Sequence, residues 1–104
     1  MHKLIIVEDE EIIRKGLINT IDWLSMGFIV IGEAEDGEEG LRLIRELEPD
    51  LVITDIKMPF LNGLDMLDLA KNTRKFESII LTSYGEFDYA KKAISVGVSD
   101  YILK

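Results

Sequence analysis

The sequence predicts a single α/β domain built on a parallel β-sheet with helices on both of its faces. Three observations support this: short apolar runs alternate with stretches of helical spacing, three of the runs are apolar at successive positions, and Gly or Pro marks the joins. Continuously apolar runs are typical of parallel strands that helices cover on both sides. The alternation predicts the order (βα)4β with right-handed crossovers.

Five runs are expected to form the strands. They are Lys3–Val7, Phe28–Glu33, Leu51–Thr54, Ser78–Leu81 and Tyr101–Leu103. Between them, apolar residues recur three or four positions apart, which predicts amphipathic helices. These positions are Ile13, Leu17, Ile21 and Leu24, then Leu41, Ile44 and Leu47, then Leu64, Leu67 and Ala70, and finally Tyr89, Ala93 and Val96.

Length and composition narrow the functional classes. A chain of 104 residues is enough for one hydrophobic core and too short for two. The net charge of −8 argues against nucleic acid as a direct partner. The absence of cysteine excludes thiolate chemistry and disulfides. No apolar run approaches the roughly 18 residues of a membrane span, and the N-terminus lacks a signal-peptide layout, so we expect a cytoplasmic protein without membrane contact.

Polar side chains follow the ends of the expected strands. Glu8 and Asp9 come after the first strand, Asp55 after the third, Thr82 at the end of the fourth and Lys104 after the fifth. Open α/β sheets bind their ligands at the carboxyl ends of the strands, so these side chains are expected to share one edge.

This set of side chains suits phosphoryl transfer. Carboxylates held close together repel one another, and a hard divalent cation such as Mg²⁺ would stabilise them in the ionised form. A carboxylate is also a competent nucleophile toward phosphorus. A lysine ammonium and a threonine hydroxyl would stabilise the phosphoryl oxygens.

Each residue also has a simpler interpretation when it is taken alone. Glu10 and Glu11 suit the start of a helix, where acidic side chains complement the helix dipole. Asp55 alone fits a turn, Thr82 a strand end, and Lys104 an ordinary surface lysine. The functional interpretation depends on their joint occurrence, in order, at one sheet edge.

The same residues resemble the receiver domain of two-component response regulators, from Lys3 to Lys104. The segments that carry the resemblance are Ile-Val-Glu8-Asp9-Glu, Asp50-Leu-Val-Ile-Thr-Asp55-Ile-Lys-Met-Pro59, Gly63, Ile-Leu-Thr82-Ser83 and Asp100-Tyr-Ile-Leu-Lys104. The resemblance implies a flavodoxin-like, doubly wound five-stranded sheet of order 2-1-3-4-5. It also implies a signalling switch that catalyses at most its own phosphorylation and dephosphorylation.

The resemblance also implies a role for each site residue. Asp55 would accept the phosphoryl group from a sensor histidine kinase. Mg²⁺ would be bound by Glu8, Asp9, Asp55 and the backbone carbonyl of Lys57. Thr82 would be the switch hydroxyl, Lys104 would pair with the phosphoryl group, and Tyr101 would change rotamer on activation.

A narrower resemblance concerns the output. Asp22-Trp23, Gly27-Phe28, the segment 32–37 and the segment 84–91 are similar to receivers attached to AraC-type helix-turn-helix domains. Trp23 and Phe28 are also expected to pack the first helix against the second strand. The parent protein would control transcription through a DNA-binding domain outside this chain and would form a homodimer on phosphorylation.

The family continues past its final lysine into a fifth helix. We therefore expect residues 1–104 to be a receiver domain truncated after the fifth strand, with the sheet face around strands one and five left without cover.

Three rival functions are weaker. A Mg²⁺-dependent phosphohydrolase with an aspartyl-phosphate intermediate would carry a second Asp where this chain has Lys57. A non-phosphorylated interaction module typically lacks one of the acidic pair, the acceptor aspartate or the lysine. This chain has all four, as Glu8, Asp9, Asp55 and Lys104. A flavin-binding domain would need a phosphate-cradling loop where this chain has Glu8 and Asp9.

Overall fold

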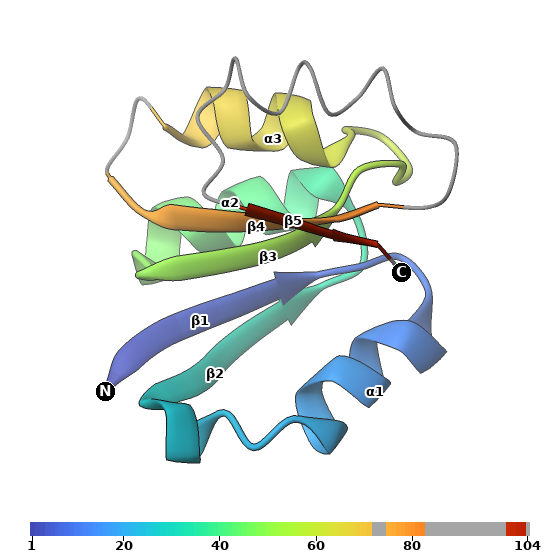
Figure 1. The fold of residues 1–104 in the computed structure, drawn as a ribbon. Coiled ribbons are helices and arrows are strands. Elements are labelled where there is room, and N and C mark those ends of the chain that lie inside the picture. Colours follow the sequence, from blue (N-terminus) through green and yellow to red (C-terminus); the bar gives the residue numbers. More distant parts are fainter. Residues whose placement is uncertain (72–74, 83–99, 104) are drawn as a thin grey trace.

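The computed structural model describes residues 1–71, 75–82 and 100–103, with side-chain surroundings described only as far as Leu81. These residues form a five-stranded sheet in which every neighbouring pair of strands is parallel (Figure 1). The strands are β1 (His2–Val7), β2 (Phe28–Ala34), β3 (Leu51–Asp55), β4 (Glu77–Thr82) and β5 (Asp100–Leu103). The order β2-β1-β3-β4-β5 confirms the predicted topology, and each strand contains its predicted range.

Three helices lie on the two faces of the sheet within the described residues. Helix α1 (Glu11–Thr20) lies on one face, and α2 (Gly37–Leu47) and α3 (Gly63–Ala70) lie together on the other (Figure 1). In the part of the chain that the structure describes, no helix has the length and apolar character of a membrane span. The predicted fourth helix, around Tyr89, Ala93 and Val96, lies outside the described residues.

The alternating side chains of the strands build two hydrophobic cores. On β1, Ile5 and Val7 belong to a cluster with residues of α2 and α3, whereas Leu4 and Ile6 belong to a cluster with Trp23. All four of these β1 side chains are fully buried. This burial on both faces explains why the strand is apolar at successive positions.

The expected loss of cover is wrong for the first strand. Leu4 and Ile6 are buried because Trp23 and the partly buried side chains of Leu17 and Ile18 pack over them. The same loss of cover was expected around the fifth strand, but the side chains of β5 lie outside the described ones.

The first helix is shorter than its apolar spacing predicted. Helix α1 ends at Thr20, Ile21 has an extended backbone (φ −90°, ψ 132°), and Leu24 is 60% exposed in a short 3₁₀ turn, η1 (Leu24–Met26). The three-to-four-residue apolar spacing therefore continues to Leu24, beyond the end of the observed helix at Thr20.

Trp23 explains this early end. Its indole Nε1 donates a 3.0 Å hydrogen bond to the carbonyl oxygen of Leu17, and its ring meets Phe28 edge-on with the centroids 6.5 Å apart. The indole is only 8% exposed, and burial of a ring of this size removes a large apolar area from water, which favours a chain path that leaves the helix before Trp23. The predicted packing of Trp23 and Phe28 between the first helix and the second strand is confirmed.

Candidate functional site

Three carboxylates lie together at the carboxyl ends of β1 and β3. Glu8 and Asp9 follow β1, and Asp55 ends β3. The pairing of Val7 with Thr54 brings Glu8 and Asp55 to the same level of the sheet. One carboxylate oxygen of each residue lies within 4.8 Å of the other two. Glu8 is fully buried and Asp55 is 4% exposed, whereas Asp9 is exposed.

The backbone around Asp55 is fixed by local hydrogen bonds. The Ile56 amide donates to Asp55 Oδ1 at 2.7 Å, and Thr54 Oγ1 donates to the Asp55 carbonyl oxygen at 2.8 Å. After the loop, the Gly63 amide donates to the Ile56 carbonyl oxygen at 2.8 Å. The first residue of α3 therefore lies directly against the end of β3.

A buried arginine for which the sequence gives no signal contacts the main chain of Glu8, a member of the cluster. Arg14 on α1 donates from Nη1 to the Glu8 carbonyl oxygen at 2.8 Å and from Nε to Glu33 Oε1 on β2 at 2.8 Å. Lys15 Nζ also donates to Glu33, at 2.9 Å to Oε2. The spacing of the acidic motif carries no signal for Arg14, because its partners come from a different strand and from a backbone carbonyl.

The two cations lower the pKa of Glu33 below its ordinary value of 4.5, first through the hydrogen bond from Lys15 and then through that from Arg14. A carboxyl group whose pKa is lower in the folded state stabilises the fold above its unfolded pKa and loses that contribution as the pH falls through the folded one. We therefore expect the stability difference between the wild type and Glu33→Gln to be complete at neutral pH and to shrink below about pH 4.5. Urea unfolding at a series of pH values measures this; a difference that stays constant down to the acid transition would contradict it.

The donor set fits a small hard cation. Mg²⁺ takes oxygen ligands at about 2.0–2.1 Å in an octahedron, so bound oxygens are roughly 3–4 Å apart. Oxygens already within 4.8 Å of one another need only small side-chain movements to reach that geometry. Three like charges at this separation also repel, and a bound dication would offset the repulsion.

The remaining predicted residues are placed only in part. Thr82 ends β4 next to Leu81, the partner of Asp55, so its backbone lies at the same sheet edge. Tyr101 pairs with Ile80 in β5. The Thr82 and Tyr101 side chains, and Lys104 as a whole, lie outside what the structure describes. Lys57 is exposed. The roles assigned to these residues stay predictions.

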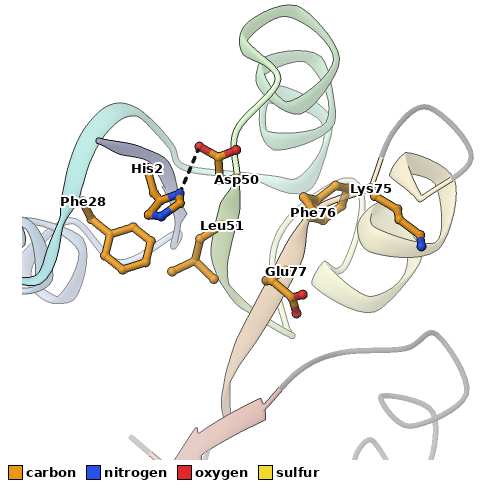
Figure 2. Close-up of a pocket in the computed structure, with 7 residues that line it drawn as sticks. All are labelled: His2, Phe28, Asp50, Leu51, Lys75, Phe76 and Glu77. Atoms are coloured by element: carbon orange, nitrogen blue, oxygen red, sulfur yellow. Dashed lines mark ion pairs between the residues drawn. The ribbon is translucent and has the colours of Figure 1, made fainter.

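A hollow lies at the opposite edge of the sheet, away from the carboxylate cluster. It has a volume of about 690 Å³ and lies at the amino ends of β1, β3 and β4 (Figure 2). His2 Nδ1 lies 4.0 Å from Asp50 Oδ2, and the Phe28 ring lies beside the His2 ring (Figure 2). Asp50 also accepts a hydrogen bond from the Lys3 amide at 2.7 Å. This contact ties the start of β3 to β1 and gives Asp50 a structural role.

The fold and the acidic edge define a class: a parallel α/β domain with a carboxylate cluster at the carboxyl ends of its strands. The chain belongs to the response regulator receiver domain family, whose sequence pattern matches residues 4–104.

Relatives and solved structures agree with this assignment. The transcriptional regulatory protein HptR of Staphylococcus aureus is 48% identical over the whole of this chain, which spans 41% of that protein's length. The receiver domain of AraT from Geobacillus stearothermophilus is 40% identical, with a TM-score of 0.93 over 99% of this chain and 81% of that one. A CheX–CheY complex with BeF₃ and Mg²⁺ from Borrelia burgdorferi contains a chain 27% identical to this one, with a TM-score of 0.85 over 99% of this chain and 78% of that one.

Proposed function

We propose that this receiver domain accepts a phosphoryl group on Asp55 from the phosphohistidine of a sensor histidine kinase. The observation that carries the proposal is the juxtaposition of a nearly buried Asp55 with Glu8 and Asp9 at one sheet edge. Glu8, Asp9, Asp55 and the Lys57 backbone carbonyl would hold Mg²⁺, which supplies positive charge to the phosphoryl oxygens. The presence of Mg²⁺ in the CheX–CheY complex supports this choice of metal.

The chain's own residues would carry out the transfer. A carboxylate oxygen of Asp55 attacks phosphorus, the P–N bond to the histidine breaks, and the imidazole keeps the electron pair. The Ile56 amide holds Asp55 Oδ1, which orients the carboxylate for attack through its other oxygen. Thr82 and Lys104 would donate to the phosphoryl oxygens from the neighbouring strand ends. The domain would thus catalyse only its own modification.

Phosphorylation would then shift a conformational population. The phosphoryl group offers contacts to Thr82 that only the modified state has, and these would move Thr82 inward and let Tyr101 rotate. The backbone pairing of Thr82 with Leu103 supports a link between the acceptor edge and β5. Because the chain spans about two fifths of its relative HptR, the output would lie in the rest of the protein. We propose transcriptional control by an AraC-type DNA-binding domain, with homodimer formation on phosphorylation.

The first test is chemical modification read by intact mass. Incubation with acetyl phosphate and Mg²⁺ is expected to add one phosphoryl group to the wild type, and EDTA is expected to prevent the addition. Asp55→Asn should gain none, because an amide is not a competent nucleophile here, while its circular dichroism spectrum stays that of the wild type.

Asp68→Asn is the matched control. Asp68 is an exposed aspartate on α3 that pairs with Lys71 at 2.9 Å, outside the acidic cluster. This variant is expected to be modified like the wild type. The proposal is refuted if the wild type shows no Mg²⁺-dependent gain of mass, or if Asp55→Asn gains the same mass.

A further inference from the structure

Arg14 is a buried cation that donates to the loop after β1, at Glu8, and to β2, at Glu33. Arg14 is only 7% exposed, whereas Glu11 and Lys15 on the same helix are exposed. Burying a guanidinium is costly unless its donors are paired, and the contacts with Glu8 and Glu33 provide that pairing at 2.8 Å each. A cation buried at this cost beside an acidic cluster calls for a reason beyond the packing of α1.

The backbone of Glu8 is held on both sides. Its amide donates to the Ala34 carbonyl oxygen of β2 at 3.0 Å, and its carbonyl oxygen accepts from Arg14 Nη1 at 2.8 Å. Arg14 is itself fixed by Glu33, the residue before Ala34 on the same strand. The point at which the chain leaves β1 is therefore clamped between β2 and α1, and the Glu8 side chain starts from a fixed backbone.

We infer that Arg14 is a positioning residue of the metal site, acting through the Glu8 main chain to hold the Glu8 and Asp9 carboxylates in reach of Asp55. This inference rests on the proposed function, since it assumes that the cluster binds Mg²⁺. The contact partner supports it: Arg14 reaches the Glu8 carbonyl oxygen, and a group that fixes a metal ligand from outside the coordination sphere acts in this way.

Charge and geometry predict opposite effects when Arg14 is removed. A nearby cation repels Mg²⁺, so by charge alone Arg14→Gln would strengthen Mg²⁺ binding. Positioning predicts the reverse, because Glu8 and Asp9 would lose their fixed backbone. We expect the Kd for Mg²⁺ of Arg14→Gln, measured by isothermal titration calorimetry, to rise about tenfold.

Lys15→Gln is the matched control. It removes the same charge from the same partner, Glu33, but from a side chain that is 48% exposed and whose hydrogen bond within the described residues goes to Glu33 and not to the Glu8 main chain. Its Kd is expected to stay within about twofold of the wild-type value or to fall slightly. An equal rise in both variants would show that the loss of the Glu33 network, and not the contact with Glu8, causes the effect, and would overturn the inference.

A second variant separates positioning from folding. Arg14→Lys keeps the charge but cannot donate to Glu8 and Glu33 in the planar geometry of a guanidinium, so an intermediate Kd is expected. Each titration is made at a temperature at which circular dichroism in EDTA shows the variant folded, and Arg14→Lys decides the question if Arg14→Gln does not fold. If the wild type binds Mg²⁺ and the folded Arg14 variant binds it equally well, the inference fails and the proposed function stands. If the wild type does not bind Mg²⁺, both fail.

Discussion

Replacing Gly63 with alanine is expected to destabilise the domain by about 3 kcal/mol and to slow phosphorylation of Asp55. A Cβ on Gly63 would collide with the Asp55 carbonyl oxygen, and it would lie 3.0 Å from both the Asp55 carbonyl carbon and Thr54 Oγ1. These are backbone and buried atoms that cannot move aside as a flexible side chain would. The end of β3 or the start of α3 must shift, and a shift of either moves the Asp55 carboxylate away from Glu8 and Asp9.

Urea unfolding and the rate of acetyl-phosphate modification measure the two parts of this prediction. Gly16→Ala is the control, because Gly16 lies within α1 and a Cβ there meets nothing within 4 Å. Alanine in place of an interior helix glycine is expected to stabilise by about 0.5–1 kcal/mol and to leave the modification rate unchanged. A Gly63→Ala protein with wild-type stability would show that α3 and β3 separate easily, contrary to their packing here.

The strands, and the meeting of the site residues at the carboxyl ends of the strands, could be predicted because they follow from local sequence patterns. Continuously apolar runs such as 51–53 mark buried parallel strands, and the topology then brings Glu8 and Asp55 to one edge without further information. The helix ends were harder to predict. Apolar spacing alone predicted that α1 would continue past Thr20. It holds no information on the burial of Trp23, whose partners Leu17 and Phe28 lie on different elements.

The residues that hold the site in place could not be predicted from the sequence, because their contacts also lie on different elements. Arg14 reads as a polar residue on an amphipathic helix, and only the folded chain brings it to Glu33 and to the Glu8 carbonyl oxygen. Gly63 was part of the resemblance to the family. The reason that glycine is needed there is that a Cβ would collide with the backbone of Asp55, eight residues earlier. Motif spacing identifies groups that do chemistry; the groups that hold them are selected by contacts between elements.

The acidic cluster predicts a trade between stability and metal binding at Glu8. Glu8 is fully buried, and its carboxylate lies within 4.8 Å of those of Asp9 and Asp55. Without a cation, ionised carboxylates at this distance repel one another by about 1 kcal/mol per pair in a water-like environment. Glu8→Gln keeps nearly the same shape and removes one of the charges. In EDTA we therefore expect this variant to be more stable than the wild type by about that amount.

The same substitution should remove most of the stabilisation by Mg²⁺. At a Mg²⁺ concentration one hundred times Kd, binding would stabilise the wild type by about 2.7 kcal/mol, and we expect less than about 1 kcal/mol for Glu8→Gln at that concentration. Urea unfolding in EDTA and in Mg²⁺ measures both effects. Glu77→Gln, the same change at the opposite edge of the sheet (Figure 2), should keep the wild-type Mg²⁺ response. A Glu8→Gln protein that is less stable in EDTA yet keeps the full Mg²⁺ response would mean that Glu8 is a structural acid. The gain of stability together with the loss of the metal response would instead show that the fold tolerates repulsion at this edge because the repulsion is relieved when the cation binds.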